Sequence, residues 1–309
     1  MTIQQKLRLL QKLSGLTQED LADKLGVTFA ALNRWFNGRA QPRQKALARI
    51  EDLYLRYSGE RRIPDSVLAA KKAILSQKRV RHPHPLRRIL HHADIHDQFM
   101  LSLTYHSNRI EGSTLTEHET AEILFENAAL PHKSLTEQLE AKNHQTALEY
   151  LWSYCATKQR LNEALVLKLH GMLMNGVRSD AGMYRNHAVR ILGAHVPTAN
   201  HLKIPVLMKE LTRAVQRTTK DAVAHIADVH KRFEQVHPFA DGNGRVGRLL
   251  LHGMALRYRL PPAVIRQEHR RLYMRYLEKA QMEDDPSLLE DFLCDAFLDG
   301  YAILERRNS

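Results

Sequence analysis

Cysteine is scarce in this chain of 309 residues, which contains only Cys155 and Cys294. Their separation matches neither a disulfide framework nor the spacing of metal-binding cysteines, so we expect two buried thiols in a reducing compartment. No apolar run approaches the roughly 20 residues needed to cross a bilayer. The opening MTIQQKLRLL mixes charged and aliphatic residues and lacks the apolar stretch of a secretory signal, so we expect a cytoplasmic protein with no membrane partner.

Two common nucleotide-binding motifs are also missing. The sequence has no GxxxxGK[ST] phosphate loop, and no glycine fingerprint follows a strand-like run as it does in dinucleotide-binding folds. The histidines His91, His92 and His96 lack the glutamate of an HExxH zinc site, which disfavours a metal centre there. Any nucleotide site in this chain must therefore use another arrangement.

Positive charge is unevenly distributed. Residues 1–90 carry 19 lysines and arginines against seven acidic residues, whereas 27 of each sign remain in residues 91–309. This concentration favours an anionic partner for the N-terminal part, with nucleic acid preferred over a membrane surface. A basic, solvated face is the alternative.

Residues 1–58 have the pattern of a compact set of short helices. Thr17 and Thr28 are typical N-cap residues, and Gly26 between them is a typical helix end. Two helices joined by a turn at Gly26 predict a helix-turn-helix. The runs Thr17-Gln-Glu-Asp-Leu-Ala, Gly26-Val-Thr and Leu32-Asn-Arg-Trp resemble the Cro/C1-type (XRE) family.

The XRE resemblance implies a domain that binds duplex DNA, with the protein's own promoter as the expected target. Five residues are expected at the start and face of the recognition helix or near the phosphates: Thr28, Phe29, Asn33, Arg34 and Arg39. The alternative is a helical module for docking or dimerisation, and a homodimer is left open.

Polar and basic runs follow this first domain. SGERRIPDS at 58–66 and RHPHPLRR at 81–88 contain prolines and predict linkers. We therefore expect a basic linker and connecting helix at 59–94, followed by a second domain at 95–300.

The second domain has an almost entirely helical pattern. Capping boxes at Thr116, Ser134 and Ser287 open three apolar-periodic runs. The exception is Ala188-Val-Arg-Ile-Leu-Gly-Ala-His-Val196, an alternating, β-branched stretch that predicts a short β-hairpin. The expected fold class is all-α with one hairpin.

The densest group of chemically active side chains lies in the run from Val236 to Arg248, VHPFADGNGRVGR, between two helical segments. Gly242-Asn243-Gly244 can direct backbone N–H groups towards an anion at a helix N-terminus. Arg245 and Arg248 add guanidinium groups on that helix. The pattern therefore predicts a phosphate site.

An acid and a base accompany the predicted phosphate site. Asp241 offers a hard oxygen ligand for Mg²⁺, and His237 offers a base of near-neutral pKa. The combination suits phosphoryl-type transfer, which depends mainly on positioning and charge stabilisation.

The run resembles the Fic family, whose motif HxFx[DE]GNGRxxR is matched at all eight specified positions. The resemblance implies an all-α core that moves AMP from ATP to a protein hydroxyl. It assigns the base to His237, Mg²⁺ to Asp241, and the phosphates to Gly242, Asn243, Gly244, Arg245 and Arg248.

The Fic resemblance extends over roughly residues 95–300. Gly182-Met-Tyr-Arg185 and the predicted hairpin look like the family's flap, which holds a target segment by its backbone. Tyr273 follows the family pattern near the adenine pocket, although a core position is the alternative. Asn143, after Glu140, resembles a further family feature.

A second motif precedes the phosphate site by about 130 residues. Ser107-Asn-Arg-Ile-Glu111-Gly112 resembles the inhibitory [ST]xxxE[GN] motif of Fic proteins, which implies an inhibitory helix around residues 100–112. A carboxylate paired with Arg248 would occupy the place that a γ-phosphate needs. The alternative is an ordinary surface glutamate before a helix-ending glycine.

Three functions stay open at this point. The leading one is autoinhibited transfer of AMP to a Ser, Thr or Tyr hydroxyl. The same site could instead remove AMP or transfer another phosphate-containing group. A transcription regulator that senses ATP without transfer is the third, and the intact base His237 argues against it.

Overall fold

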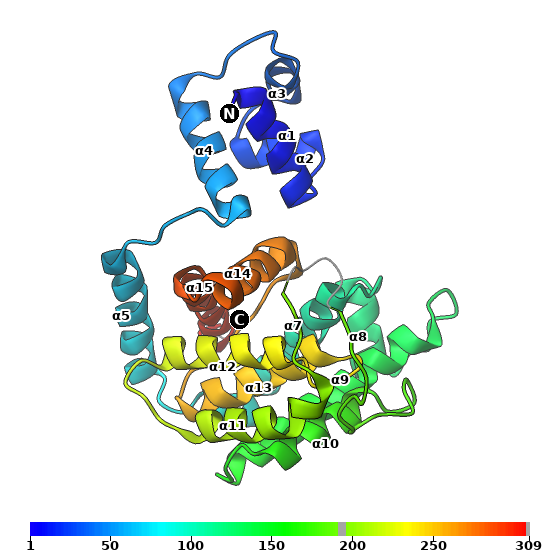
Figure 1. Ribbon diagram of the computed structural model, residues 1–309. Helices are drawn as coiled ribbons and strands as arrows, with labels where there is room; N and C mark the ends of the chain where they lie inside the picture. Colours follow the sequence, from blue (N-terminus) through cyan, green and yellow to red (C-terminus); the bar gives the residue numbers. More distant parts are fainter. Residues whose placement is uncertain (191–195, 307–309) are drawn as a thin grey trace.

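The computed structural model describes residues 1–190 and 196–306, and within these residues every regular element is a helix. Figure 1 shows four N-terminal helices standing as a separate bundle on a larger helical body. The two parts have separate hydrophobic cores. The predicted all-α class is confirmed.

The N-terminal bundle consists of α1 (Ile3–Ser14), α2 (Gln18–Leu25), α3 (Phe29–Phe36) and α4 (Gln44–Ser58). The side chains of Thr17 and Thr28 cap α2 and α3, as the sequence predicts, and Gly26 ends α2 in the left-handed conformation. Apolar side chains at helical spacing fill its core, among them Leu7, Leu21, Leu32 and Trp35.

The connection to the larger body contains two helices, α5 (Asp65–Arg81) and α6 (Pro85–His91). The linker predicted at 81–88 is therefore wrong for most of its length. Pro85 occupies the first turn of α6, where a proline lacks no hydrogen bond and its fixed φ suits the helix.

The larger body packs around α12 and α13, which lie side by side in the middle of Figure 1. α13 is buried along nearly its whole length because other helices surround it. The helices of this body are α7 (Ala93–Glu111), α8 (Glu117–Phe125), α9 (Leu135–Ala156), α10 (Glu163–Leu173), α11 (Ile204–Gln216), α12 (Ala222–Val236), α13 (Asn243–Arg257), α14 (Arg270–Glu283) and α15 (Ser287–Leu304), with 3-10 turns η1 (His201–Lys203) and η2 (Gln267–His269).

The three predicted capping boxes have different outcomes. Thr116 forms a full box with Glu119, and Ser134 caps α9 through the N–H of Glu137. The box at Ser287 is wrong, because Ser287 is itself the first helical residue and Pro286 takes the cap position.

The predicted hairpin at 188–196 falls largely on residues outside those that the structure describes. Of its ends, residues 188–190 and Val196 are not strand. Thr198 donates its hydroxyl to the carbonyl of Val189 at 2.7 Å, so the described flanks lie together. Among the described residues no helix is long and apolar enough to span a membrane.

Candidate active site

The site lies in the loop between α12 and α13 and begins at His237. α12 ends at Val236, and His237 follows with φ 49°, a left-handed conformation that is uncommon outside glycine. Its Nδ1 lies 3.3 Å from the carbonyl oxygen of Glu234, which can only accept a hydrogen bond. Nδ1 therefore carries the proton, and Nε2 is the nitrogen that can act as a base.

Burial lowers the pKa of His237 below its ordinary value; the nearby charge of Arg185 acts in the same direction, and the carbonyl of Glu234 opposes it. The imidazole is therefore neutral at pH 7. A neutral imidazole with a free Nε2 is the form needed for general-base chemistry.

Asn243 fixes the shape of the loop. Its side-chain oxygen accepts from the N–H of Phe239 at 2.9 Å, and its amide nitrogen donates to the carbonyl of Phe239 at the same distance. These two bonds close the loop across Asp241, and Asn243 is almost fully buried. The side chain of Asn243 therefore positions the loop.

His170, which the sequence analysis missed, supports the same loop from α10. Its ring stacks on Phe239 with centroids 3.7 Å apart. Nδ1 accepts from the N–H of Gly182, and Nε2 donates to the carbonyl of Asp241. Burial lowers the pKa of His170 to about 4, so this tautomer stays uncharged.

Arg185 holds the loop from the other side. Its guanidinium donates to the carbonyls of His237, Ala199 and His187, and its backbone N–H donates to the carbonyl of Pro238. The side chain is only 4% exposed. The predicted flap region is thus tied to the loop that carries the base.

The start of α13 has the geometry of an anion site. The first N–H groups of a helix have no partner within it, and the helix dipole favours negative charge there. Gly242 caps α13 with φ 77°, and a Cβ at this position would lie 2.9 Å from the Sδ of Met174. Asp241 stands beside it with its side chain 55% exposed, and one carboxylate oxygen accepts from the N–H of Gly242.

Arg248, one helical turn further along α13, meets the end of α7. Its Nε donates to the hydroxyl of Ser107 at 2.9 Å, and its Nη2 donates to Oε1 of Glu111 at 2.7 Å. Arg248 is 2% exposed. The structure thus brings Arg248 to two residues that lie about 140 positions earlier in the sequence.

The carboxylate of Glu111 also lies against Gly244. A Cβ built on Gly244 would be 2.2 Å from Oε1 of Glu111, so the carboxylate fills the space that the missing side chain leaves. Burial acts to raise the pKa of Glu111, but the charges of Arg248, Arg245 and Arg270 outweigh it and the pKa is lowered. A charged carboxylate therefore occupies the anion position at the start of α13.

Arg245 faces a different acid. Its Nη1 lies 2.6 Å from Oε1 of Glu140 on α9, and its side chain is almost fully buried. Asn143, one turn further along α9, donates its amide to the carbonyls of Leu173 and Asn175 at the end of α10. Glu140 is the partner of Arg245 that the sequence left unassigned.

Buried histidines surround the charge of Arg248. Burial lowers the pKa of His230 and His252 to about 3, and that of His144 lies well below its usual value. These imidazoles stay neutral and add no charge of their own. Tyr273 is buried and shares a 2.6 Å hydrogen bond with His230, which is the core position that the sequence left as an alternative.

Glu234 is a second buried acid that the sequence did not indicate. Burial raises the pKa of Glu234 to about 8, against the charge of Arg248, so this carboxyl is mostly protonated at pH 7. Glu111 is then the charged acid that pairs with Arg248.

The predicted DNA-contact residues lie on and around α3. Phe29 is 46% exposed, and Arg34 and Arg39 are also exposed. The hydroxyl of Thr28 accepts from the N–H of Ala31 as the helix cap. Asn33 is partly covered and donates to the side chain of Gln18 on α2.

Comparison with known proteins finds a match for the N-terminal bundle and another for the larger body. A family model described as Fic/DOC family matches residues 160–255, and a model described as helix-turn-helix matches residues 6–55. The curated protein adenylyltransferase Fic of Drosophila erecta is 31% identical over 184 residues, which are 58% of this chain and 37% of that protein. The Drosophila melanogaster protein is 30% identical over an equal length. The chain thus spans little more than a third of these relatives.

Solved structures share the fold. A Fic domain containing signaling protein from Bacteroides thetaiotaomicron matches with a TM-score of 0.64 and 24% identity, covering 78% of this chain and 98% of that one. Fic-1 from C. elegans matches with a TM-score of 0.67 and 22% identity, covering 92% and 83%.

Proposed function

We propose that this protein transfers AMP from ATP to a protein hydroxyl, is autoinhibited by Glu111 and binds duplex DNA; the matches of residues 160–255 to the Fic/DOC family and of residues 6–55 to the helix-turn-helix model support this. The observation that carries the proposal is the loop itself, which joins a neutral base at His237 to an anion site at the start of α13. The relatives named protein adenylyltransferase support AMP as the transferred group.

In the proposed reaction, Nε2 of His237 takes the proton of an incoming Ser, Thr or Tyr hydroxyl while that oxygen bonds to the α-phosphorus of ATP. The bond from the α-phosphorus to the oxygen that bridges to the β-phosphate breaks, and pyrophosphate leaves. AMP stays on the target as a phosphodiester, and His237 returns its proton to water. The target is a second protein or the chain itself.

In this proposal α13 stabilises the negative charge of the phosphates. The N–H groups around Gly242, Asn243 and Gly244 receive phosphate oxygens, and Arg248 neutralises the terminal phosphates. Glu140 balances the charge of Arg245, and this ion pair holds the start of α13 against α9.

Asp241 would hold Mg²⁺. Within the described residues no three His, Cys, Asp or Glu side chains gather as a metal cage. Mg²⁺ is usually held by one or two carboxylates together with phosphate oxygens and water, so a single exposed aspartate at the phosphate site fits this ion. When bound, the ion would neutralise charge on the phosphates.

A direct test of the activity uses labelled ATP with Mg²⁺. Label from α-labelled ATP is expected on protein, and label from γ-labelled ATP is not. Transfer of the γ-label would instead indicate a kinase and contradict the proposal.

The pH dependence of transfer follows from the lowered pKa of His237. The base form persists down to that pKa, so the acid limb of kcat/KM should have its midpoint below the ordinary pKa of histidine. The Glu111→Gly variant gives measurable rates and shifts the pKa further down, because the charge of Glu111 raises it. An acid limb with its midpoint above pH 7 would contradict this assignment.

DNA binding by the N-terminal domain should be sensitive to salt. Replacing both Arg34 and Arg39 by alanine should weaken binding of a mixed-sequence duplex and lower the slope of log K against log[salt] by about 2. Fluorescence anisotropy over a KCl series measures both, with Arg213→Ala on α11 as the control. A wild-type chain whose DNA retention is independent of salt would favour the docking or dimerisation module.

A further inference from the structure

One turn of α14 contacts both the helix-turn-helix bundle and the end of α7. Four consecutive residues, Arg270 to Tyr273, each face a different part of the molecule. The inference from these contacts rests on the proposed function.

Arginines of α14 cap the ends of two N-terminal helices. Nη1 of Arg271 donates to the carbonyls of Lys12 and Leu13 at the end of α1, and Arg275 donates twice to the carbonyl of Ser58 at the end of α4. Guanidinium groups suit these sites because the last carbonyls of a helix lack partners and carry partial negative charge.

The joint also has an apolar part. Leu272 packs against the core of the N-terminal bundle and against the core of the larger body. Gly15, which ends α1, leaves room for the guanidinium of Arg271, because a Cβ there would lie 2.1 Å from its Nη2. Polar and apolar contacts together therefore hold the N-terminal bundle against α14.

The same turn reaches the inhibitory glutamate. Nε of Arg270 donates to the carbonyl of Ile110, the residue before Glu111, at 2.5 Å. The charge of Arg270 also contributes to the lowered pKa of Glu111. Tyr273 bonds to His230 inside the body, and its neighbour Arg248 is the partner of Glu111.

We propose that α14 couples DNA binding by the helix-turn-helix bundle to ATP binding at Arg248. Productive binding of ATP must displace Glu111 from Arg248, which moves the end of α7 against Arg270. Arg271 is the next residue on the same rigid turn, so this movement is passed on to the contacts that hold the ends of α1 and α4 against α14. Each ligand thus alters the affinity for the other.

The geometry allows both ligands at once. Figure 1 shows α3 on the side of the bundle away from the larger body, while the ends of α1 and α4 face α14. The recognition helix is therefore free when the bundle is seated. This arrangement therefore predicts that DNA and ATP alter each other's affinity, and not that one ligand excludes the other.

Reciprocity gives a strict test in the full chain. The dissociation constant of a labelled duplex is measured with and without α,β-methylene ATP, which cannot transfer AMP, and that of the nucleotide is measured with and without the duplex. Linkage requires the same factor in both directions, and allosteric couplings are usually 5–150-fold. We expect a factor of at least five in the wild-type chain.

Variants locate the coupling. Arg271→Ala with Arg275→Ala should retain both ligands and bring the factor to about one, and Arg270→Ala, which leaves the bundle seated, should do the same. Arg213→Ala with Arg232→Ala, exposed or half-exposed arginines away from the joint, should keep the wild-type factor.

Two results would overturn the coupling: a factor of one in the wild-type chain, or an unchanged factor in both α14 variants. A failure of the proposed function looks different. It would show as absent DNA binding, or as no AMP transfer by Glu111→Gly, in assays run without the second ligand.

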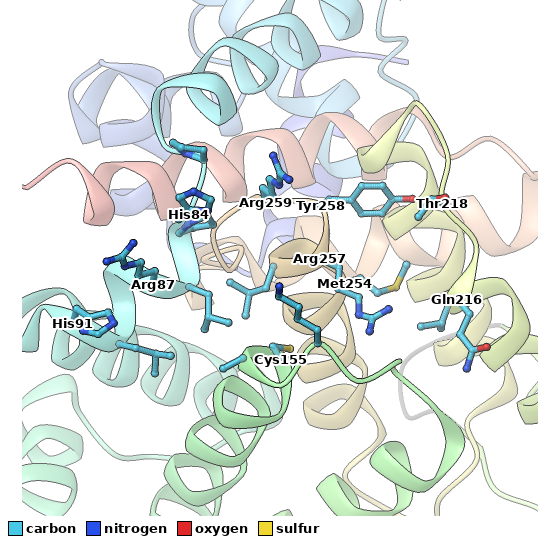
Figure 2. Close-up of a pocket in the computed structure, with 18 of the residues that line it drawn as sticks. His84, Arg87, His91, Cys155, Gln216, Thr218, Met254, Arg257, Tyr258 and Arg259 are labelled. Atoms are coloured by element: carbon cyan, nitrogen blue, oxygen red, sulfur yellow. The ribbon is translucent and has the colours of Figure 1, made fainter.

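A different observation carries a second inference. A cavity of about 740 Å³ lies at the C-terminal end of α13, the opposite end from the catalytic loop, between α6, the end of α9 and the end of α11. Figure 2 shows Cys155 and Met254 among the side chains that line it, together with Arg87, Arg257 and Arg259. The volume is that of a site for a small organic molecule.

The lining is cationic and contains no acid. Arg87, Lys158, Arg217 and Arg259 line the cavity without an ion pair among the described residues, and no Asp or Glu contributes to it. Lys158 and Arg259 follow the ends of α9 and α13 with φ 60° and 57°, a conformation in which glycine is the usual residue. One lysine and one arginine thus occupy helix ends at which glycine, with no side chain, is the usual residue.

We infer that this cavity binds an amphipathic organic anion, whose phosphate, sulfonate or carboxylate group meets the arginines while its apolar body covers Met254 and Leu86. The probe is 1-anilinonaphthalene-8-sulfonate, titrated into the full chain by fluorescence. Arg217→Glu with Arg259→Glu should raise its dissociation constant at least tenfold. Lys209→Glu with Arg213→Glu, exposed positions of equal charge change outside the cavity, should not. Equal affinities in both pairs would overturn the inference.

Discussion

Replacing Glu111 by glycine should increase AMP transfer on the order of a hundredfold, which corresponds to about 2.7 kcal/mol of activation free energy. The carboxylate lies 2.7 Å from Nη2 of Arg248 and fills the space above Gly244, so ATP must break this pair before its terminal phosphates can reach the arginine. Incorporation of label from α-labelled ATP, at saturating ATP, measures the change.

Two companion variants separate charge from shape. Glu111→Gln keeps the size of the side chain and removes its charge, so it should activate less than glycine. Arg248→Ala should weaken productive ATP binding, and the double variant with Glu111→Gly should resemble Arg248→Ala alone. An unchanged rate in Glu111→Gly at saturating ATP would remove Glu111 from any inhibitory role.

In the activated Glu111→Gly background, His237→Ala should lower transfer by a factor of 10² to 10⁴, the usual contribution of a general base. ATP binding should persist, since Nε2 is needed only when the hydroxyl attacks. Calorimetry of ATP binding, beside the labelling assay, separates the two effects. His118→Ala on α8, where the imidazole is highly exposed, is the control for removing a histidine.

If His237→Ala kept substantial transfer, the proposed base would be wrong. Loss of ATP binding together with transfer would instead indicate a collapsed loop, because His237 ends α12 in a left-handed conformation. His237→Asn tests that point, since asparagine tolerates this backbone better than alanine.

The loop of the candidate site could be predicted from the sequence because its parts are contiguous. Within His237 to Arg248 the backbone places the base, the glycines and both arginines at fixed offsets along one loop and one helix. The contact of Glu111 with Arg248 was expected as well, although only through the resemblance of a short motif. No local rule of spacing would have brought α7 to α13.

The side chains that position the loop could not be predicted. His170, Arg185 and Glu140 come from two different helices and one connection, and each acts through a partner distant in the chain. A single histidine or glutamate in an amphipathic helix carries no signal until the packing shows what it touches.

The errors in the fold have local causes. Pro83 and Pro85 favour a linker by sequence, but a proline is also favoured in the first turn of a helix, where Pro85 lies. The serine at 287 fitted a capping box by spacing, but the helix starts one residue earlier than that motif requires.

Under the proposed function, Gly244 has a consequence for how this protein could evolve. The missing side chain that opens the start of α13 to phosphate is the same gap that receives the carboxylate of Glu111. A mutation that fills the gap would displace both the carboxylate of Glu111 and the phosphate of the proposed substrate, so it offers no route to constitutive activity. Selection for permanent activity would have to change α7, whereas selection for loss of activity could act by a single substitution at Gly244.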